Sequence, residues 1–322
     1  MSHPAVFHAV AICIAIVGGA ACRGSGGDSA GDAGRELIDA APDVKADATP
    51  PRNERFRMAT WNLGCLLDDD ESVYCNTTEL GETYIRTQAH LDELAAHGEM
   101  LDADMVFVQE VENPAALNLV FPGWEVQTVG TGIQQVGIAV SPTSSATLIS
   151  VAPLDSLEVS PSLRAGLVAT IEFQQEQIQI LAVHLKTGCI VSPLDSGDLA
   201  CDILVDQLNV IVDWIEERRS LDEMFMLTGD FNRIMEGGED FFTTLQDAAG
   251  GGLYRTTSDR ETTCWHHHPD APQFTNYIDH HIASEDVVAR FGLPIFELHN
   301  FSALYEDAWI FLSDHCPIVA EL

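Results

Sequence analysis

The chain has 322 residues, of which 50 are acidic and 15 are basic, so its formal net charge at neutral pH is −35. Only seven of the acidic and five of the basic residues precede Phe56, which leaves 43 acidic and 10 basic residues for positions 56–322. Tight binding of a polyanion draws on counterion release at Lys and Arg, so this balance argues against a general nucleic-acid-binding surface. Solubility or a salty habitat explains the acidity at least as well as any partner does.

Residues 1–22 have the pattern of a secretory signal. An apolar block from Ala9 to Val17 is followed by small residues and Cys22, and this block is too short to span a membrane. Cys22 stands where a bacterial lipoprotein is cleaved and acylated; ordinary cleavage nearby, with loss of Cys22, is the alternative. We therefore expect an exported protein, either a cell-envelope lipoprotein that touches the membrane only through its N-terminal anchor or a secreted protein.

Residues 23–55 are rich in Gly, Ala, Asp, Ser and Pro and contain almost no large apolar side chains. Such a segment cannot bury enough surface to offset its ordering entropy, so we expect a flexible tether. Residues 56–322 are long enough to form one large core. We expect them to be a single domain and a monomer.

Six cysteines remain in the globular part once Cys13 and Cys22 are set aside. An even number in an exported protein suggests disulfides. The expected pairs are Cys65–Cys75 and Cys189–Cys201, each closing a short polar loop, and, by elimination only, Cys264–Cys316. A zinc site built on Cys264 and the histidines at 266–268 is the competing interpretation.

Apolar periodicity divides the globular part into strands and helices. It begins with an alternating strand, Phe56–Asn62, and a helix follows over 85–98 with Gly98 as its end. Met105–Glu110 is a nearly continuous apolar run of the buried-strand type. Further strands are predicted at 125–129, 136–140, 167–173, 178–184, 224–230, 277–282 and 318–320, with an amphipathic helix at 204–215 and loops with short helices over 236–272.

Several predicted strands end in side chains that can do acid–base or metal chemistry. These residues are Asn62, Glu110, His184, Asp230, Asn232, Asp279, Asp314 and His315. Asp230 and Asn232 are two residues apart and so point the same way from one strand end. A right-handed crossover would make the strands ending at Asn62 and Glu110 parallel neighbours. Taken singly, each residue also has a common structural explanation, such as an Asx turn or a buried core histidine.

Metal-assisted phosphoester hydrolysis needs a carboxylate for Mg²⁺, donors for the phosphate oxygens, an acid or base for water, and a carboxylate that orients a histidine. The chain supplies each of these. Their order and local sequence resemble the endonuclease/exonuclease/phosphatase superfamily. The resemblance covers residues 56–322 and rests on Thr60-Trp61-Asn62-Leu63, Val108-Gln109-Glu110, Val183-His184-Leu185, Thr228-Gly229-Asp230-Phe231-Asn232, Ile278-Asp279 and Ser313-Asp314-His315.

The resemblance implies an α/β fold: a four-layer α/β/β/α sandwich of two mostly antiparallel sheets flanked by helices. It makes Glu110 the principal Mg²⁺ ligand with Asn62 beside it, and Mn²⁺ or Ca²⁺ is the alternative ion. Asp230 would act on the attacking water or at a second metal position, and Asn232 would hold the phosphate. Arg164, one of the ten basic residues of the domain, would help to bind the anion.

The resemblance also places two histidines on either side of one phosphate. His184 would be the acid near the leaving group, with Asp279 as its orienting carboxylate. His315 would be the second imidazole, with Asp314 as a metal-side carboxylate. Carboxylate partners should keep both histidines protonated to higher pH than a free imidazole.

Two departures from the family pattern bear on the substrate. Glu112 stands where deoxyribonucleases of the family tend to carry a basic residue, and the segment after His184 lacks the catalytic tyrosine of the abasic-site repair branch. Three interpretations remain open. The first is an exported Mg²⁺-dependent phosphodiesterase of endonuclease type. The second is a hydrolase of a phospholipid head group or small phosphate ester, and the third is a non-catalytic binding module of the same fold.

Overall fold

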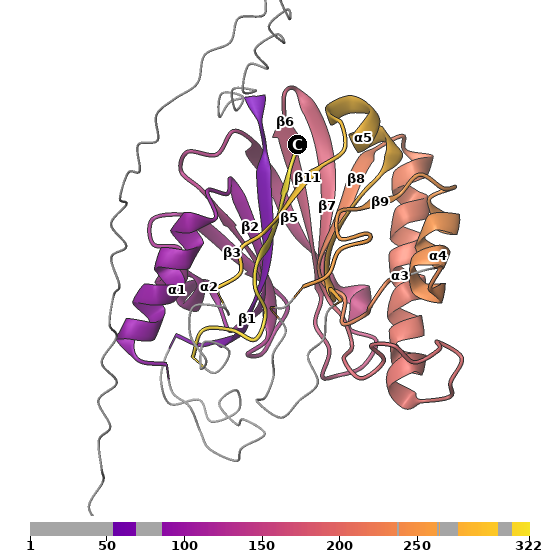
Figure 1. Ribbon diagram of the computed structural model, residues 1–322, viewed down its shortest axis with the longest axis horizontal. Helices are drawn as coiled ribbons and strands as arrows, with labels where there is room; N and C mark the ends of the chain where they lie inside the picture. Colours follow the sequence, from indigo (N-terminus) through magenta and orange to yellow (C-terminus); the bar gives the residue numbers. More distant parts are fainter. Residues whose placement is uncertain (1–53, 69–85, 237, 263, 265–275, 302–310) are drawn as a thin grey trace, which may run out of the picture. The chain divides into compact units, whose positions relative to one another are not determined.

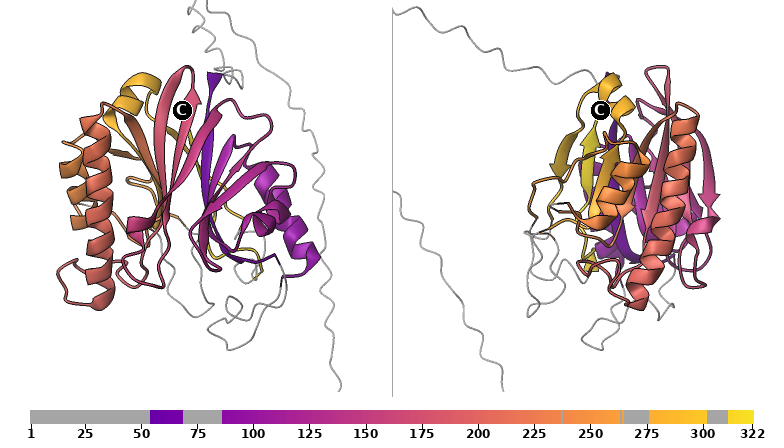
Figure 2. Two further views of the ribbon diagram at one scale, coloured as in Figure 1. Left: turned by 180° about the vertical axis from the view of Figure 1, so that it is seen from behind. Right: turned by 90° about the vertical axis from the view of Figure 1, so that its right-hand side faces the viewer.

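The computed structural model describes residues 54–68, 86–236, 238–262, 264, 276–301 and 311–322. Two six-stranded sheets face each other, and helices cover their outer faces (Figures 1 and 2). Among the described residues, eight of the ten strand pairs are antiparallel. The predicted four-layer α/β/β/α sandwich is therefore confirmed.

The first sheet has the strand order β11-β12-β1-β2-β4-β3. Its strands are β1 (Arg57–Leu66), β2 (Met105–Val111), β3 (Glu125–Val129), β4 (Gln135–Val140), β11 (Ile295–Leu298) and β12 (Ile318–Glu321). Helices α1 (Gln88–Met100) and α2 (Pro114–Val120) cover its outer face. Trp61 and Val108 point outward from the central strands into the cluster that also holds Leu94 of α1 and Leu117 of α2.

The second sheet has the order β5-β6-β7-β8-β10-β9. Its strands are β5 (Thr147–Leu154), β6 (Gly166–Phe173), β7 (Glu176–His184), β8 (Met224–Asp230), β9 (Tyr254–Arg255) and β10 (Asp279–Ala283). Helices α3 (Leu199–Ser220) and α4 (Asp240–Ala248) cover its outer face, the 3₁₀ turn η2 (Asp155–Leu157) follows β5, and α5 (Glu285–Phe291) follows β10. Leu227 and Phe225 of β8 pack outward against α3 residues such as Ile211 and Ile215.

The layer between the sheets is apolar because alternate residues of each strand point into it. Met58 of β1, Phe107 of β2, Ile180 of β7 and Met226 of β8 all belong to this cluster and are fully buried. Burial of a side chain of this size contributes about 1.5–3 kcal/mol relative to exposure. The central strands are buried on both faces, which explains why β2 and β8 are continuous apolar runs in the sequence.

The only two parallel pairs among the described strands lie at the centre of the two sheets. β1 runs parallel to β2, with Asn62 opposite Gln109, and β7 runs parallel to β8, with His184 opposite Asp230. The predicted parallel neighbours that end at Asn62 and Glu110 are thus confirmed. Each parallel pair brings two polar strand ends to one edge of its sheet.

Some local predictions need correction. Gly98 does not end the first helix: α1 continues to Met100, and a Cβ at Gly98 would come 3.0 Å from the ring of Phe121. This glycine therefore allows close packing and is not a helix cap. The sequence also gave no signal for α2, β5, α5 and β11, because these elements are short or have largely exposed strand faces.

Two predicted disulfides are present, Cys189–Cys201 and Cys264–Cys316. The second bond engages the sulfur of Cys264, which removes the thiolate that a zinc site there would require. Cys75, the expected partner of Cys65, and the histidines at 266–268 lie outside the described residues. No helix of the described part is long and apolar enough to cross a membrane.

Gly229, directly before Asp230, has a φ of 126°, and a Cβ there would overlap the carbonyl oxygen of Val183 on the neighbouring strand. We predict that Gly229→Ala lowers the free energy of unfolding, measured by urea titration, by at least about 2 kcal/mol more than Gly292→Ala does. Gly292 also has a positive φ, 91°, but nothing lies within 4 Å of a Cβ at that position. Equal losses in the two variants would show that strand β7 relaxes without cost.

Candidate functional site

Glu110 is aimed by an irregularity at the end of β2. The pairing of β2 shifts register against both of its neighbours. Against β1 the shift falls between Asn62 and Leu66 of β1, and against β4 it falls between Val108 and Val111 of β2. Glu110 lies in this shifted segment and adopts a φ of 59°, which is unusual for a residue other than glycine. Bulges of this kind redirect a side chain at a sheet edge. The backbone is therefore strained at the residue that carries the carboxylate.

Asn62 connects the two sheets through its side-chain amide. Its Nδ2 donates to Oε1 of Glu110 at 3.4 Å and to Oδ2 of Asp230 at 3.1 Å. Its Oδ1 accepts from the backbone N–H of Gly64 at 3.0 Å. Asn62 thus holds one carboxylate from each sheet, and a role as a direct metal ligand through Oδ1 would require it to release Gly64.

Asp230 and Asn232 form a compact turn after β8. The backbone N–H of Asn232 donates to Oδ1 of Asp230 at 2.8 Å, and Asn232 adopts a φ of 50°. Its Nδ2 lies 3.1 Å from the carbonyl oxygen of Leu185 and 3.2 Å from Oδ2 of Asp230. Asn232 therefore positions Asp230 and the chain after His184, while its predicted contact with phosphate stays a prediction.

His184 lies inside the site and not in the apolar core. Its Nε2 is 3.6 Å from Oε1 of Glu110 and 3.6 Å from Oδ2 of Asp230. Its Nδ1 is buried and has no hydrogen-bond partner among the described residues. Burial lowers the pKa of His184 well below 6.5, and the positive charges of Arg164 and His315 lower it further. The prediction of a raised pKa is therefore wrong for His184.

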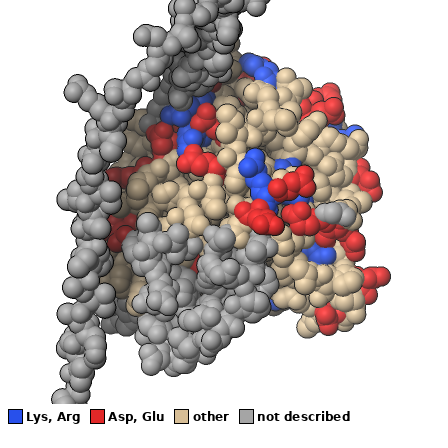
Figure 3. Space-filling model, viewed as in Figure 1, with Lys and Arg blue, Asp and Glu red and all other residues tan. Residues whose placement is uncertain are grey.

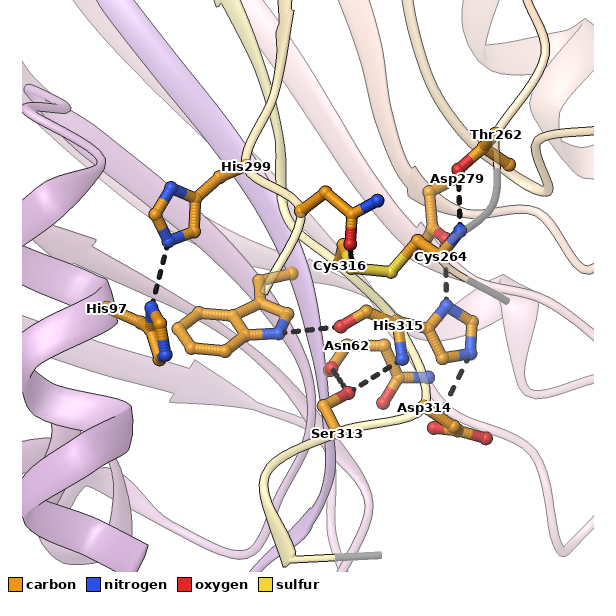
Figure 4. The surroundings of a disulfide bond; sticks show 12 residues. Asn62, His97, Thr262, Cys264, Asp279, His299, Ser313, Asp314, His315 and Cys316 are labelled. Atoms are coloured by element: carbon orange, nitrogen blue, oxygen red, sulfur yellow. Dashed lines mark hydrogen bonds and ion pairs between the residues drawn. A yellow bond between two sulfur atoms is a disulfide. The ribbon is translucent and has the colours of Figure 1, made fainter. Parts of the chain in front are cut away.

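His315 is held by Asp279, at 2.8 Å between Nδ1 and Oδ2 (Figure 4). Its Nε2 lies 3.9 Å from Oδ2 of Asp230 and 3.9 Å from Oδ1 of Asp314. Burial alone would lower the pKa of His315, but Asp279, Asp314 and Asp230 outweigh it and raise the pKa well above 6.5. The predicted raised pKa is confirmed for this histidine.

The prediction that Asp279 orients His184 is wrong. Asp279 orients His315 and not His184, because β10 pairs with β8 on the side away from β7, with Asp279 opposite Asp230. His184 on β7 is therefore separated from Asp279 by strand β8. Even so, both imidazoles approach the same oxygen, Oδ2 of Asp230, as a pair acting on one phosphate would require.

The carboxylates of the site are crowded, and the positive charges near them do not fully offset burial and mutual repulsion. Burial and then the charge of Asp314 raise the pKa of Glu110. Burial and the charge of Asp279, opposed by His315, raise the pKa of Asp230 to about 7. Ligand atoms of Asp230, Asp279 and His315 also lie within 4.8 Å of one another. Crowded buried carboxylates of this type suit a hard divalent cation. Of the predicted ligands, the group formed by Asp230, Asp279 and His315 contains Asp230 alone, and its other two members already bond to each other.

Arg164 brings a positive charge to this edge from the loop before β6. Its guanidinium donates to the carbonyl oxygen of Leu185 at 3.3 Å, while its buried Nε has no partner among the described residues. Burial lowers the pKa of Arg164, and Glu110 and Asp230 oppose the change. All eight predicted strand-end residues and Arg164 are thus brought to one edge of the sandwich.

The sequence does not reveal what two further residues, Ser313 and Trp61, do in the site. Ser313 donates through Oγ to the carbonyl oxygen of Asn62 at 2.6 Å and accepts from the backbone N–H of His315 at 2.9 Å (Figure 4). Trp61 donates from Nε1 to the carbonyl oxygen of His315 at 3.1 Å. Trp61 and Ser313 both belong to recognised motifs, but only the fold shows that they hold the histidine.

An α/β/β/α sandwich with an Asp–His pair and clustered carboxylates at its strand ends is the architecture of a phosphoesterase fold. Residues 59–315 match the Endonuclease/Exonuclease/phosphatase family, and the chain belongs to that family. No curated protein matches the chain.

Solved structures share the fold at low sequence identity. Humanized TDP2 of D. rerio is 13% identical, with a TM-score of 0.57 over 83% of this chain and 98% of that one. The 3′-5′ exonuclease NExo of Neisseria meningitidis is 16% identical, with a TM-score of 0.56 over 82% and 98%. An AP endonuclease of Archaeoglobus fulgidus is 14% identical, with a TM-score of 0.53 over 82% and 98%.

We predict that Asp279→Asn lowers the pKa of His315, followed by NMR of the imidazole nitrogens without added metal, because it removes a negative charge and leaves at most a weaker, neutral hydrogen bond. Asp314→Asn is the matched control: it removes a weaker charge contribution and should lower the pKa less. The raised pKa contributes stability that is complete below pH 6.5 and is lost as the pH rises through the folded-state value. Equal pKa values in Asp279→Asn and the wild type would exclude the pairing.

Proposed function

We propose that the chain is a divalent-metal-dependent phosphoric ester hydrolase that cleaves phosphodiester bonds. The observation that carries this proposal is the convergence of Asn62, His184 and His315 on one oxygen of Asp230, next to Glu110. A buried Asp279–His315 pair beside a carboxylate on a strained backbone is typical of acid–base chemistry, which favours an enzyme over a non-catalytic binding module.

Glu110, Asp314 and Asp230 would hold the cation. When bound, a divalent cation supplies positive charge to the phosphate and lowers the pKa of a water molecule. Mg²⁺ fits a set of oxygen ligands best, and Mn²⁺ or Ca²⁺ would accept the same ligands.

The chain's own residues divide the acid–base work. Asp230, with a pKa raised to about 7, can accept a proton from the attacking water near neutral pH. His315 carries a proton at neutral pH and is the better acid for the leaving group, whereas neutral His184 can donate a hydrogen bond to a phosphate oxygen. These pKa directions exchange the roles that the family resemblance gives to the two histidines. Arg164 adds positive charge for the anion.

Nucleic acid is the first substrate class to test. Similar structures were solved with such ligands: TDP2 of D. rerio with a single-strand DNA product and NExo with a product DNA hairpin. Both share the fold at 15% and 16% identity, so they support the proposal through the fold alone.

We predict that Glu110→Gln lowers kcat for bis(p-nitrophenyl) phosphate in Mg²⁺ by at least about 10³-fold while thermal unfolding changes little, because an isosteric amide removes charge without opening a cavity. Glu112→Gln is the matched control, since Glu112 accepts a hydrogen bond from the N–H of Asp68 and, in the described part of the chain, has no ion pair or side-chain hydrogen bond with a predicted ligand. It should keep wild-type kcat. A large loss of stability in Glu110→Gln with full activity per folded molecule would make Glu110 structural.

A second candidate function is hydrolysis of a small phosphate ester or a phospholipid head group. It is favoured by the small number of Lys and Arg side chains placed for phosphate contacts. All ten Lys and Arg of positions 56–322 lie in the described part of the chain. Five of them form ion pairs: Arg57, Arg218, Arg233, Arg255 and Arg290. Three donate to backbone carbonyls: Arg86, Arg219 and Arg260. Figure 3 shows basic side chains lying among acidic ones on one face.

Arg164 and Lys186 also donate to backbone carbonyls, of Leu185 and Thr187, but they lie beside Leu185 at the candidate site and are the cations placed for phosphate contacts. Two cations fit one phosphate group better than a long polyanion. Each phosphate of double-stranded DNA bound through Lys or Arg contributes about 0.9 to the slope of log affinity against log salt. The salt dependence thus distinguishes the two substrate classes.

We predict that log KM for double-stranded DNA rises with log [NaCl], at fixed Mg²⁺, with a slope of no more than about 2. Lys186→Ala should reduce this slope by about 1, and Arg290→Ala, which removes an ion pair with Glu176 on the surface, should leave it unchanged. A slope of about 6 or more would mean extensive backbone contacts and would decide for a polynucleotide substrate.

We also propose that the protein is exported, with residues 1–22 as the signal, Cys22 as the acylated residue and residues 23–55 as the tether. The two disulfides of the catalytic domain support this proposal, because disulfides form and persist in oxidising compartments.

A further inference from the structure

Arg86, directly before α1, makes an unusual set of contacts. Its guanidinium donates only to backbone carbonyls in the described structure, at two separate segments. The bonds are Nε to Phe311 at 3.0 Å, Nη1 to Cys65 at 2.8 Å, and Nη2 to Leu63 at 2.7 Å, Gly64 at 2.9 Å and Leu312 at 2.6 Å. A guanidinium can reach such a set because it is planar and carries five N–H groups; Nη2, with two N–H groups and three acceptors, shares at least one N–H between two carbonyls.

The turn after Asn62 presents three carbonyl oxygens that the planar guanidinium of Arg86 can bind together. Gly64 and Cys65 have consecutive positive φ values of 54° and 61°, and the carbonyls of residues 63–65 all face the Arg86 guanidinium. Three carbonyl dipoles aimed at one point are unfavourable without a donor, since buried carbonyls need hydrogen-bond partners. The ammonium of a lysine has three donors on one atom and cannot reach five carbonyls in a plane.

The two segments that Arg86 joins both carry site residues. Leu63 follows Asn62, which holds Glu110 and Asp230. Phe311 and Leu312 precede the segment 313–315, which contains Ser313, Asp314 and His315. The Ser313 hydroxyl joins the same two segments close to the histidine, through the carbonyl oxygen of Asn62 and the N–H of His315 (Figure 4).

Arg86 also carries charge into this region. Burial lowers its pKa to about 10, and the carboxylates of Asp314 and Glu110 act in the opposite direction. The side chain therefore stays protonated at neutral pH. Its charge acts on the two carboxylates on which the predicted metal site depends, while its hydrogen bonds in the described structure go to backbone oxygens.

We propose that Arg86 is a positioning residue of the hydrolase: by binding carbonyls of residues 63–65 and 311–312 together, it fixes Asn62 relative to Asp314 and His315. It touches neither substrate nor reacting atoms in this role. The catalytic consequence rests on the proposed function, whereas the coupling of the two segments does not.

The test replaces Arg86 by Ala in the full chain and follows hydrolysis of bis(p-nitrophenyl) phosphate with Mg²⁺. We expect kcat to fall by about 100-fold with KM changed by less than about 3-fold, because misplaced groups lose transition-state contacts first. Guanidinium chloride at about 50 mM should restore kcat at least about 10-fold by occupying the same carbonyls, and NaCl at equal concentration should not.

Arg57→Ala is the matched control. Arg57 lies on β1, the strand that also contains residues 63–65, and it donates to the Leu101 carbonyl and to Glu297 and Glu321. The variant removes an arginine with backbone and ionic contacts outside the site, so it should keep wild-type kcat and show no rescue. Wild-type kcat in folded Arg86→Ala overturns the proposal, as does a loss that guanidinium does not reverse.

Arg86→Lys covers the case in which the alanine variant does not fold. It keeps the charge and should fold, with kcat about 10-fold lower because one ammonium cannot serve five carbonyls. Wild-type kcat in Arg86→Lys overturns the five-donor argument.

Hydrogen exchange of metal-free protein separates this inference from the proposed function. Residues 61–66 and 311–316 should exchange faster in both Arg86 variants than in the wild type, and unchanged exchange overturns the coupling of the two segments. If the wild type hydrolyses no phosphoester, the proposed function fails and the exchange measurement still decides the role of Arg86.

Discussion

One amide group, that of Asn62, holds the functional edge of the two sheets together. Most of the contact between the sheets is through apolar side chains, which tolerate small sliding motions. Polar links among the described residues are few: His281 bonds to the carbonyl of Ile318, Asp279 bonds to His315, and Nδ2 of Asn62 is bound to Glu110 of one sheet and Asp230 of the other. A hydrogen bond tolerates only a narrow range of distance and angle. The spacing of the carboxylates therefore depends on how well the apolar layer fixes one sheet against the other. A change in the packing of the core would therefore also change the geometry of the site.

The two histidines show how environment assigns different chemistry to the same side chain. Both are buried, and burial alone disfavours the charged imidazole in each. His315 has a carboxylate on Nδ1 and two others nearby, whereas His184 faces the positive charges of Arg164 and His315. One site thus contains a charged and a neutral imidazole at the same pH. A bound cation would add to the positive field around both.

The sequence predicted the strands that are continuous apolar runs, the parallel β1–β2 pair and the set of polar strand ends, because these follow from periodicity and from chain connectivity. It could not predict which carboxylate serves which histidine. Asp279 reaches His315 only because antiparallel pairing places β10 beside β8 and beyond β7. The left-handed φ of Glu110 arises from register shifts against two neighbours. Arg86 belongs to no periodic pattern, so its five contacts appear only in three dimensions.

The Cys264–Cys316 disulfide adjoins the candidate site, since Cys316 is the residue after His315 and lies 5.7 Å from Cys264 between Cα atoms (Figure 4). The bond closes a covalent ring that contains Asp279 and His315, so the hydrogen-bonded pair lies within a single cross-linked loop. Cys264 and Cys316 also belong to the buried cluster that packs beneath α1 and α2, so the ring is anchored in the core at both of its ends. The cross-link therefore limits the conformational freedom of the segment that carries both the imidazole and its carboxylate.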